Sequence, residues 1–284
     1  MKKSIFGELY YKVFQSGSPL YLFIGINVLV FLAINLFAAG EYLTGGITPG
    51  ADWLTRQLSM PAYYAAIPYK FWTILTYMFT QREFFHLLFN MLWLYWLGII
   101  FLDFLNKRQF IFTYLAGGVM GALFYMLAYN LIPVFSGSFE RSFLIGSSAS
   151  VMAIVVATAT LVPDFTIRLL FFGGVKLKYL ALVYFILDII GISGTEPGGS
   201  IAHIGGAVMG FIYIRQLNNG NDFSTIFKSK SRLKIVKNKN TPPAHEINLP
   251  DQDAIDKILD KISQSGYESL TKTEKEQLFK ASSK

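Results

Sequence analysis

Three polar side chains within the apolar part of the sequence have the types needed for nucleophilic chemistry. Ser148 follows Gly146 in a run of small residues, while His86 and His203 fall within or beside long apolar stretches. A serine hydroxyl becomes a nucleophile when an imidazole accepts its proton, so Ser148 and His203 could together cleave an amide bond. Ionisable groups within a membrane segment are costly, which makes both histidines candidates for a functional site. The sequence has no cysteine, which excludes a thiol nucleophile.

His86 and Asn90 add groups that could stabilise a developing negative charge. Their i, i+4 spacing places both on one face of a helix, and both are neutral hydrogen-bond donors suited to an oxyanion. Each candidate also has a simpler structural explanation. Small residues around Ser148 are common in contacts between membrane helices, and the two histidines and Asn90 could serve as polar contacts between helices.

His203 lies on a face of small residues that could bring its imidazole close to Ser148. Helical spacing places His203, Gly206 and Gly210 on this face. Because the face has no bulky side chain, the backbone of a neighbouring helix can approach it. An adjacent helix could therefore carry Ser148 to within hydrogen-bond reach of the imidazole.

These residues must be positioned by membrane-spanning helices, because the composition is that of a membrane protein. Hydrophobic residues make up 53% of the 284 residues and charged residues only 15%, against roughly 25% charged residues in soluble domains. A helix needs about 20 mostly apolar residues to cross a bilayer. Six stretches are predicted as spans, the last two of them short: residues 20–39, 84–102, 110–134, 144–162, 179–192 and 200–214.

The positive charges lie next to these stretches and predict their orientation. Lysine and arginine residues precede the first span, join the second to the third and the fourth to the fifth, and follow the sixth. By the positive-inside rule these segments, and both termini, face the cytoplasm. The net charge of +7 is therefore interpreted as topological and not as a nucleic-acid surface. The second, fourth and sixth spans then begin at the outer side of the membrane, near His86, Ser148 and His203. The three residues therefore lie at similar depth, which favours one shared site.

The combination of these motifs resembles the rhomboid family of intramembrane serine proteases. The resemblance covers roughly residues 20–215, and the motifs that carry it are the long loop after the first span, His86 with Asn90, Gly146-Ser147-Ser148-Ala149, and Ala202-His203 followed by Gly206 and Gly210. It implies that Ser148 is the nucleophile, that His203 is the general base and then the acid, and that His86, Asn90 and the Ser148 amide are oxyanion donors. It also implies no metal or cofactor, substrates with transmembrane segments, and a short fourth span that starts below the membrane surface.

Three positions depart from the rhomboid pattern. Ala149 replaces the usual glycine after the nucleophile, Met152 stands where an aromatic residue often lies beneath the histidine, and Trp72-Thr73 stands in place of a Trp-Arg pair. Asp188 could orient His203 as the third member of a triad. Because the resemblance implies a two-residue design, an interfacial or cavity-lining position is the favoured interpretation of Asp188.

The expected fold is an all-α membrane protein, a six-transmembrane-helix rhomboid-like bundle with a short soluble helical tail. Four parts are predicted: an N-terminal cytoplasmic segment (1–19), a membrane protease domain (20–218), a basic linker (219–250) and a small module (251–284) with helices over 251–263 and 271–281. The module is similar to one attached to some bacterial rhomboid-like proteins. The expected location is therefore the bacterial cytoplasmic membrane, and the expected partners are the lipid bilayer and membrane-protein substrates, with no nucleic acid.

The leading functional prediction is a serine-type endopeptidase that cuts other membrane proteins. One alternative is a non-catalytic rhomboid-like protein that binds membrane clients, although relatives of that kind usually lack the serine or the histidine, and both are present here. A second alternative is a small transporter in which His86 and His203 are proton or substrate ligands.

Overall fold

The computed structural model describes residues 4–45, 50–169, 173–227 and 251–282. The chain divides into two compact units, Met1–Ser229 and Lys230–Lys284. The first unit contains the apolar helices and the four residues predicted for the site. The basic run at residues 228–239, which the sequence assigns to a linker, lies outside the described residues.

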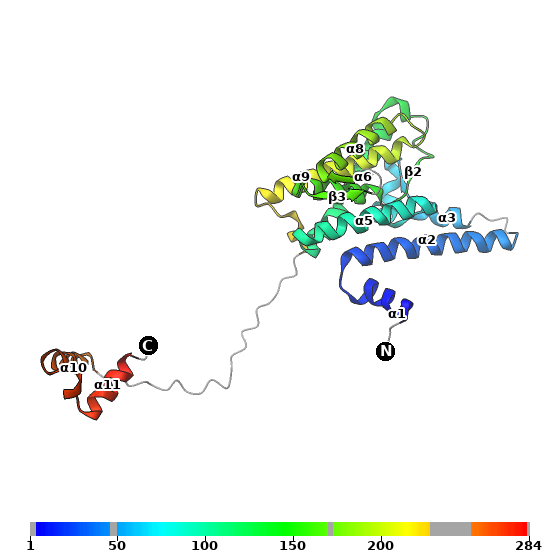
Figure 1. Cartoon of the computed structure of the whole chain (residues 1–284). Helices are drawn as coiled ribbons and strands as arrows, with labels where there is room; N and C mark the ends of the chain where they lie inside the picture. The colour runs from blue at the N-terminus through cyan, green and yellow to red at the C-terminus, as the bar shows by residue number, and fades with distance from the viewer. Residues whose placement is uncertain (1–3, 46–49, 170–172, 228–250, 283–284) are drawn as a thin grey trace. The chain divides into compact units, whose positions relative to one another are not determined.

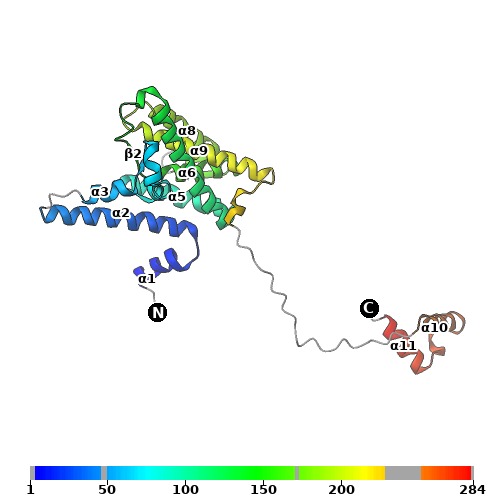
Figure 2. The ribbon, with the colours of Figure 1, turned by 180° about the vertical axis from the view of Figure 1, so that it is seen from behind.

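Four helices of the first unit are long and apolar enough to cross a membrane: α2 (Pro19–Leu43), α5 (Phe84–Phe104), α6 (Lys107–Leu131) and α9 (Pro197–Asn218). Two further helices, α7 (Ser148–Leu161) and α8 (Leu177–Gly191), have 14 and 15 residues. Both views of the chain show α5 between α2 and the part of the bundle that contains α6, α8 and α9 (Figure 1, Figure 2). The chain is therefore a mainly helical, multi-pass membrane protein, and a count of six spans stays a prediction for the two short helices.

The predicted fourth span, residues 144–162, begins too early. Phe143 and Leu144 form strand β2, which pairs antiparallel with β1 (Met60–Pro61) from the loop between α2 and α5. Gly146 then turns the backbone with a φ of 113°, in the region that favours glycine, and α7 begins at Ser148. Hydropathy does not separate a short apolar strand from the helix that follows it, which explains the error.

The central helix α7 contacts α5, α6, α8 and α9. Its backbone lies directly against α9, because a Cβ added at Gly206 would overlap the carbonyl oxygen of Ala149, and one added at Gly210 would overlap that of Ala153. Small side chains permit this approach between membrane helices, which larger ones would prevent. The predicted face of small residues on the last span is confirmed, and its partner is the helix that begins with Ser148.

Shorter elements connect these helices. In chain order they are α1 (Ile5–Tyr10), a π-helical turn (Tyr11–Gln15), α3 (Gly50–Leu58), a 3-10 turn (Tyr64–Tyr69), α4 (Thr73–Thr76), 3-10 turns at Tyr77–Phe79 and Pro133–Phe135, strands β3 (Thr166–Leu169) and β4 (Gly173–Lys176), and a 3-10 turn (Phe223–Phe227). The antiparallel hairpin of β3 and β4 joins α7 to α8.

The second unit contains the two helices that the sequence predicts for the tail, α10 (Gln252–Ser265) and α11 (Lys272–Ser282), with a 3-10 turn at Tyr267–Ser269 between them. Glu274 accepts hydrogen bonds from the Thr271 amide at 2.7 Å and from Lys261 on α10 at 3.0 Å. Thr271 and Glu274 therefore hold the first turn of α11. Ile258 and Leu270 are the buried apolar residues of this unit within its described part.

Candidate active site

Ser148 is the first residue of α7, directly after a sharp turn. The Gly146 amide donates a hydrogen bond to the Tyr77 carbonyl oxygen at 3.0 Å, which ties this turn to the loop before α5. The first amides of a helix have no partner within the helix, so the backbone around Ser148 can donate to an anion. Ser148 thus combines a hydroxyl with amide donors at one point of the fold.

His203 lies on α9 with its Nδ1 atom 2.7 Å from Oδ1 of Asp188 on α8. The Asp188 side chain is 11% exposed and that of His203 is 25% exposed. A carboxylate accepts hydrogen bonds and does not donate them, so Nδ1 is the donor in this bond, and in a neutral imidazole Nε2 is left as the acceptor. The interpretation that Asp188 is interfacial or merely lines a cavity is wrong, because the residue is buried against the imidazole.

Two cavities meet at the predicted residues. The larger, about 490 Å³, is lined by His86, Ser148 and His203, with the charged residues Arg82, Glu83 and Glu196 also in its wall. The smaller, about 180 Å³, is lined by His86, Asn90, Ser148 and His203, together with apolar and aromatic side chains that include Met152, Trp93 and Tyr184. All four residues predicted for the site therefore share walls, although they come from three helices.

Gly146 lies next to both Ser148 and His86. An ideal Cβ built on Gly146 would lie 3.1 Å from Cε1 of His86 and 3.7 Å from Oγ of Ser148. Ser148 and His203 both belong to the described residues, and no direct hydrogen bond joins their side chains in this structure. Catalytic hydrogen bonds are often long in the absence of substrate, so the shared cavity and not a closed bond defines the pair.

A buried polar network fixes Asn90, and its central residue, Gln81, was not among the residues predicted for the site. The Gln81 amide donates to Asn27 Oδ1 at 2.8 Å and to Ser147 Oγ at 3.1 Å, and its Oε1 accepts from Asn90 Nδ2 at 3.3 Å. Gln81 is fully buried. The amide group of Asn90 has two hydrogens, so one bond to Gln81 leaves the second for a ligand. The polar side chain of Gln81, five residues before His86 in the sequence, was the signal that could have identified it.

The loop before α5 is held by hydrogen bonds near the larger cavity. Arg82, which lines that cavity, lies 2.8 Å from the Asp52 carboxylate and donates to Thr55 Oγ1 at 2.9 Å. Trp72, half of the pair that departs from the rhomboid pattern, donates from Nε1 to the Gln57 carbonyl oxygen at 2.8 Å. The adjacent Thr73 is fully buried. The loop is therefore anchored by Trp72 and Arg82, although the position after Trp72 holds a threonine where the rhomboid pattern has an arginine.

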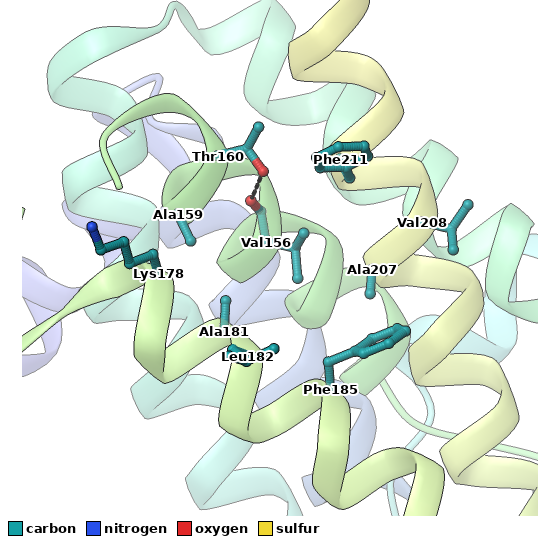
Figure 3. Close-up of a pocket in the computed structure, with 10 residues that line it drawn as sticks. All are labelled: Val156, Ala159, Thr160, Lys178, Ala181, Leu182, Phe185, Ala207, Val208 and Phe211. Carbon is teal, nitrogen blue, oxygen red and sulfur yellow. Dashed lines mark hydrogen bonds between the residues drawn. The ribbon is translucent and has the colours of Figure 1, made fainter. Parts of the chain in front are cut away.

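A third cavity, about 430 Å³, lies between α7, α8 and α9 towards the opposite end of α7 from Ser148 (Figure 3). Its wall is apolar apart from Thr160, which donates to the Val156 carbonyl oxygen at 2.7 Å, and Lys178 at one edge. Among the described residues, no group of three or more His, Cys, Asp or Glu side chains could hold a metal ion. This third cavity therefore lacks the serine and the two histidines, which line the two cavities beside Ser148.

Comparison with known proteins adds family assignments for two parts of the chain. A model of the rhomboid domain matches residues 68–218, and a model of a family of unknown function (DUF6576) matches residues 249–284. The chain is 27% identical over 157 residues to RHOMBOID-like protein 12, mitochondrial, of Arabidopsis thaliana, a match that covers 52% of this chain and 47% of that protein. The chain thus spans about half the length of this relative. Both cavities beside Ser148 lie within the segment matched by the rhomboid model.

Proposed function

Because the chain belongs to the rhomboid family, we propose that it is an intramembrane serine endopeptidase that cuts other membrane proteins in or near their transmembrane segments. The observation that carries this proposal is the cavity shared by Ser148, His203 and His86. A hydroxyl, an imidazole with a free Nε2 and further hydrogen-bond donors are the groups that acyl transfer requires.

In this mechanism, Ser148 Oγ attacks the carbonyl carbon of the scissile bond while His203 Nε2 takes the hydroxyl proton. The tetrahedral oxyanion is stabilised by His86, Asn90 and the Ser148 amide. His203 then gives the proton to the leaving amine, which breaks the C–N bond and leaves an acyl-serine. Water that enters through the larger cavity hydrolyses this ester, with His203 acting again as base and then as acid.

The substrate must present an extended backbone to this cavity. A carbonyl within a helix is hydrogen-bonded and covered by side chains, whereas an unwound segment exposes it to attack. Transmembrane segments with helix-breaking residues near one membrane surface therefore fit the site best. The proposed partners are membrane-protein substrates and the lipid bilayer.

The finer location is part of the same proposal. The lysine and arginine residues that flank the spans favour cytoplasmic termini, and the tail resembles a module of bacterial rhomboid-like proteins. We therefore assign the chain to a bacterial cytoplasmic membrane, with the larger cavity open to the outer side. Cysteine introduced at exposed Ser136 or Asn219, tested with an impermeant thiol reagent on intact cells, should label only the former.

Two measurements on purified protein test the activity. A fluorophosphonate probe should label the wild type and fail on Ser148→Ala, and cleavage of a single-span reporter should be lost in both Ser148→Ala and His203→Ala. Ser136→Ala and His245→Ala serve as matched controls and should behave as the wild type. Reporter cleavage that survives Ser148→Ala would refute the assigned nucleophile.

Ser148 and His203 form no hydrogen bond with each other in the described part of the chain, which favours one second candidate, a rhomboid-like protein that binds membrane clients without cutting them. In that case the reporter would co-purify with the wild type, and neither cleavage nor probe labelling would occur. Mass mapping of the reporter after long incubation decides between the two, because a single cut position indicates turnover at one site.

A further inference from the structure

We propose that Asp188 is a positioning residue that holds the His203 imidazole for proton transfer and stabilises its protonated form, so that the site works as a triad. The inference rests on the proposed function. Its observation is the 2.7 Å hydrogen bond between Oδ1 of Asp188 and Nδ1 of His203.

Asp188 is buried although it lies on a mostly exposed, apolar helix. The residue lies near the end of α8, and on that helix only Leu177, Leu180, Ala181 and Asp188 are buried. A carboxylate in an apolar helix is costly unless it is paired, and an aspartate without a role there would be expected to reach water. Asp188 instead faces inward and meets the imidazole, so its buried position is accounted for by this contact.

The hydrogen bond between His203 and Asp188 also determines which nitrogen of the imidazole can accept a proton. Because the carboxylate accepts the Nδ1 hydrogen, the neutral imidazole has its lone pair on Nε2, the only nitrogen left to receive the Ser148 proton. When the proton arrives, the imidazolium forms beside a negative charge that is already in place. The proton remains on Nε2 and passes to the leaving amine.

None of the described residues that line the two cavities, Glu83 and Glu196 included, forms a hydrogen bond with His203, whereas Asp188 does. Met152 faces the smaller cavity from α7, and its thioether is only a weak hydrogen-bond acceptor. Tyr184, one turn before Asp188 on α8, packs edge-on against Trp93 with ring centroids 5.1 Å apart. These side chains shape the cavity, whereas the hydrogen bond from Asp188 fixes the rotation of the imidazole ring.

The test uses Asp188→Ala and Asp188→Asn in the full chain, with Asp103→Ala as the matched control, since Asp103 is an exposed aspartate on α5. Both Asp188 variants should lower kcat for reporter cleavage by about 10²-fold while KM changes by less than about twofold. Asp103→Ala should keep wild-type kinetics. Circular dichroism melting in detergent shows whether each variant folds, and Asp188→Asn preserves the shape of the side chain.

Formate provides a readout that a purely structural role would not give. Added sodium formate should restore part of the kcat of Asp188→Ala in a concentration-dependent way, because the small carboxylate can occupy the vacated space beside Nδ1. Sodium chloride at equal ionic strength should not. Wild-type kcat in Asp188→Ala, or a loss of kcat that formate does not relieve, would overturn the role of Asp188. If the wild type itself neither labels nor cleaves, the proposed function fails instead.

Discussion

Two short helices of similar length, α7 and α8, meet the same site in opposite ways. In α7, ten of the 14 residues are buried, whereas in α8 only four of 15 are buried. The α7 backbone packs directly against α9 at Gly206 and Gly210, while α8 reaches the site through two side chains, Asp188 and Tyr184. The position of Ser148 is thus set by close packing of backbones, and the contact from α8 is set by a hydrogen bond.

The side-chain sizes explain the difference. The buried residues of α7 include Ala149, Ser150, Ala153 and Ala157, which allow neighbouring helices to approach. The outer face of α8 carries large apolar residues such as Leu182, Ile186 and Leu187, which are exposed in the bundle and suited to lipid. Without a hydrophobic difference between lipid and protein interior, small side chains mark the contacts between membrane helices.

The largest effect should come from breaking the packing of α7. Gly206→Ala places a methyl group on the Ala149 carbonyl oxygen, next to Ser148, and should destabilise the fold by about 3 kcal/mol or more. Reporter cleavage should fall by about 10²-fold, because a small displacement of a nucleophile is costly. Gly40→Ala on α2 is the control, since a Cβ there meets nothing within 4 Å. A Gly206→Ala protein with the wild-type Tm would show that α7 is not wedged.

The next effect concerns the polar network at the amino end of α7. Gln81→Met removes the partner of Asn27, Ser147 and Asn90, and leaving such buried groups unpaired should cost about 1–3 kcal/mol. We expect a lower Tm and a drop of about tenfold in kcat, because Asn90 loses its orientation. Gln57→Met on α3 is the matched control. A lowered Tm with an unchanged kcat would show that the network stabilises the fold but does not orient Asn90 for the reaction.

A smaller effect should distinguish the two faces of α8. Leu180 is buried, whereas Leu187 is 57% exposed. Leu180→Ala should cost about 1 kcal/mol, since the helix stays in lipid when the bundle opens and only packing contacts are lost. Leu187→Ala should cost less than about 0.5 kcal/mol. Equal losses of Tm in the two variants would contradict the assignment of an outer face to α8.

The smallest effect concerns the link between the two helices. Hydrogen bonds from Lys178 and Lys176 lower the pKa of Asp164, in the connection after α7, to about 2. A carboxylate whose pKa is lowered on folding stabilises the fold at pH values above its ordinary pKa, and this contribution disappears as the pH falls towards 2. The Tm of Asp164→Asn should be slightly below that of the wild type at pH 6 and equal to it near pH 2. The difference should be small, because the ion pairs are exposed.

Most of the helical layout could be predicted from the sequence, and so could the proximity of the four candidate residues, which line one cavity, because apolar stretches and paired motifs are local signals. The face formed by Gly206 and Gly210 also follows from helical spacing. The start of α7 did not follow, since β2 is as apolar as the helix and only Gly146 marks the turn. The contact of Asp188 with His203 depends on the rotation of α8 about its own axis, which hydropathy does not specify.

The length of α8 gives its hydrogen bond to His203 a mechanical meaning. Fifteen residues of helix extend about 22 Å, less than the roughly 30 Å of a typical hydrocarbon core. If α8 crosses the bilayer, as the sequence predicts, the surrounding lipids must compress or the helix must shift, and both responses depend on bilayer thickness. In the proposed mechanism, the Asp188 carboxylate passes such a shift to the imidazole, and we expect the rate of reporter cleavage to depend on lipid chain length.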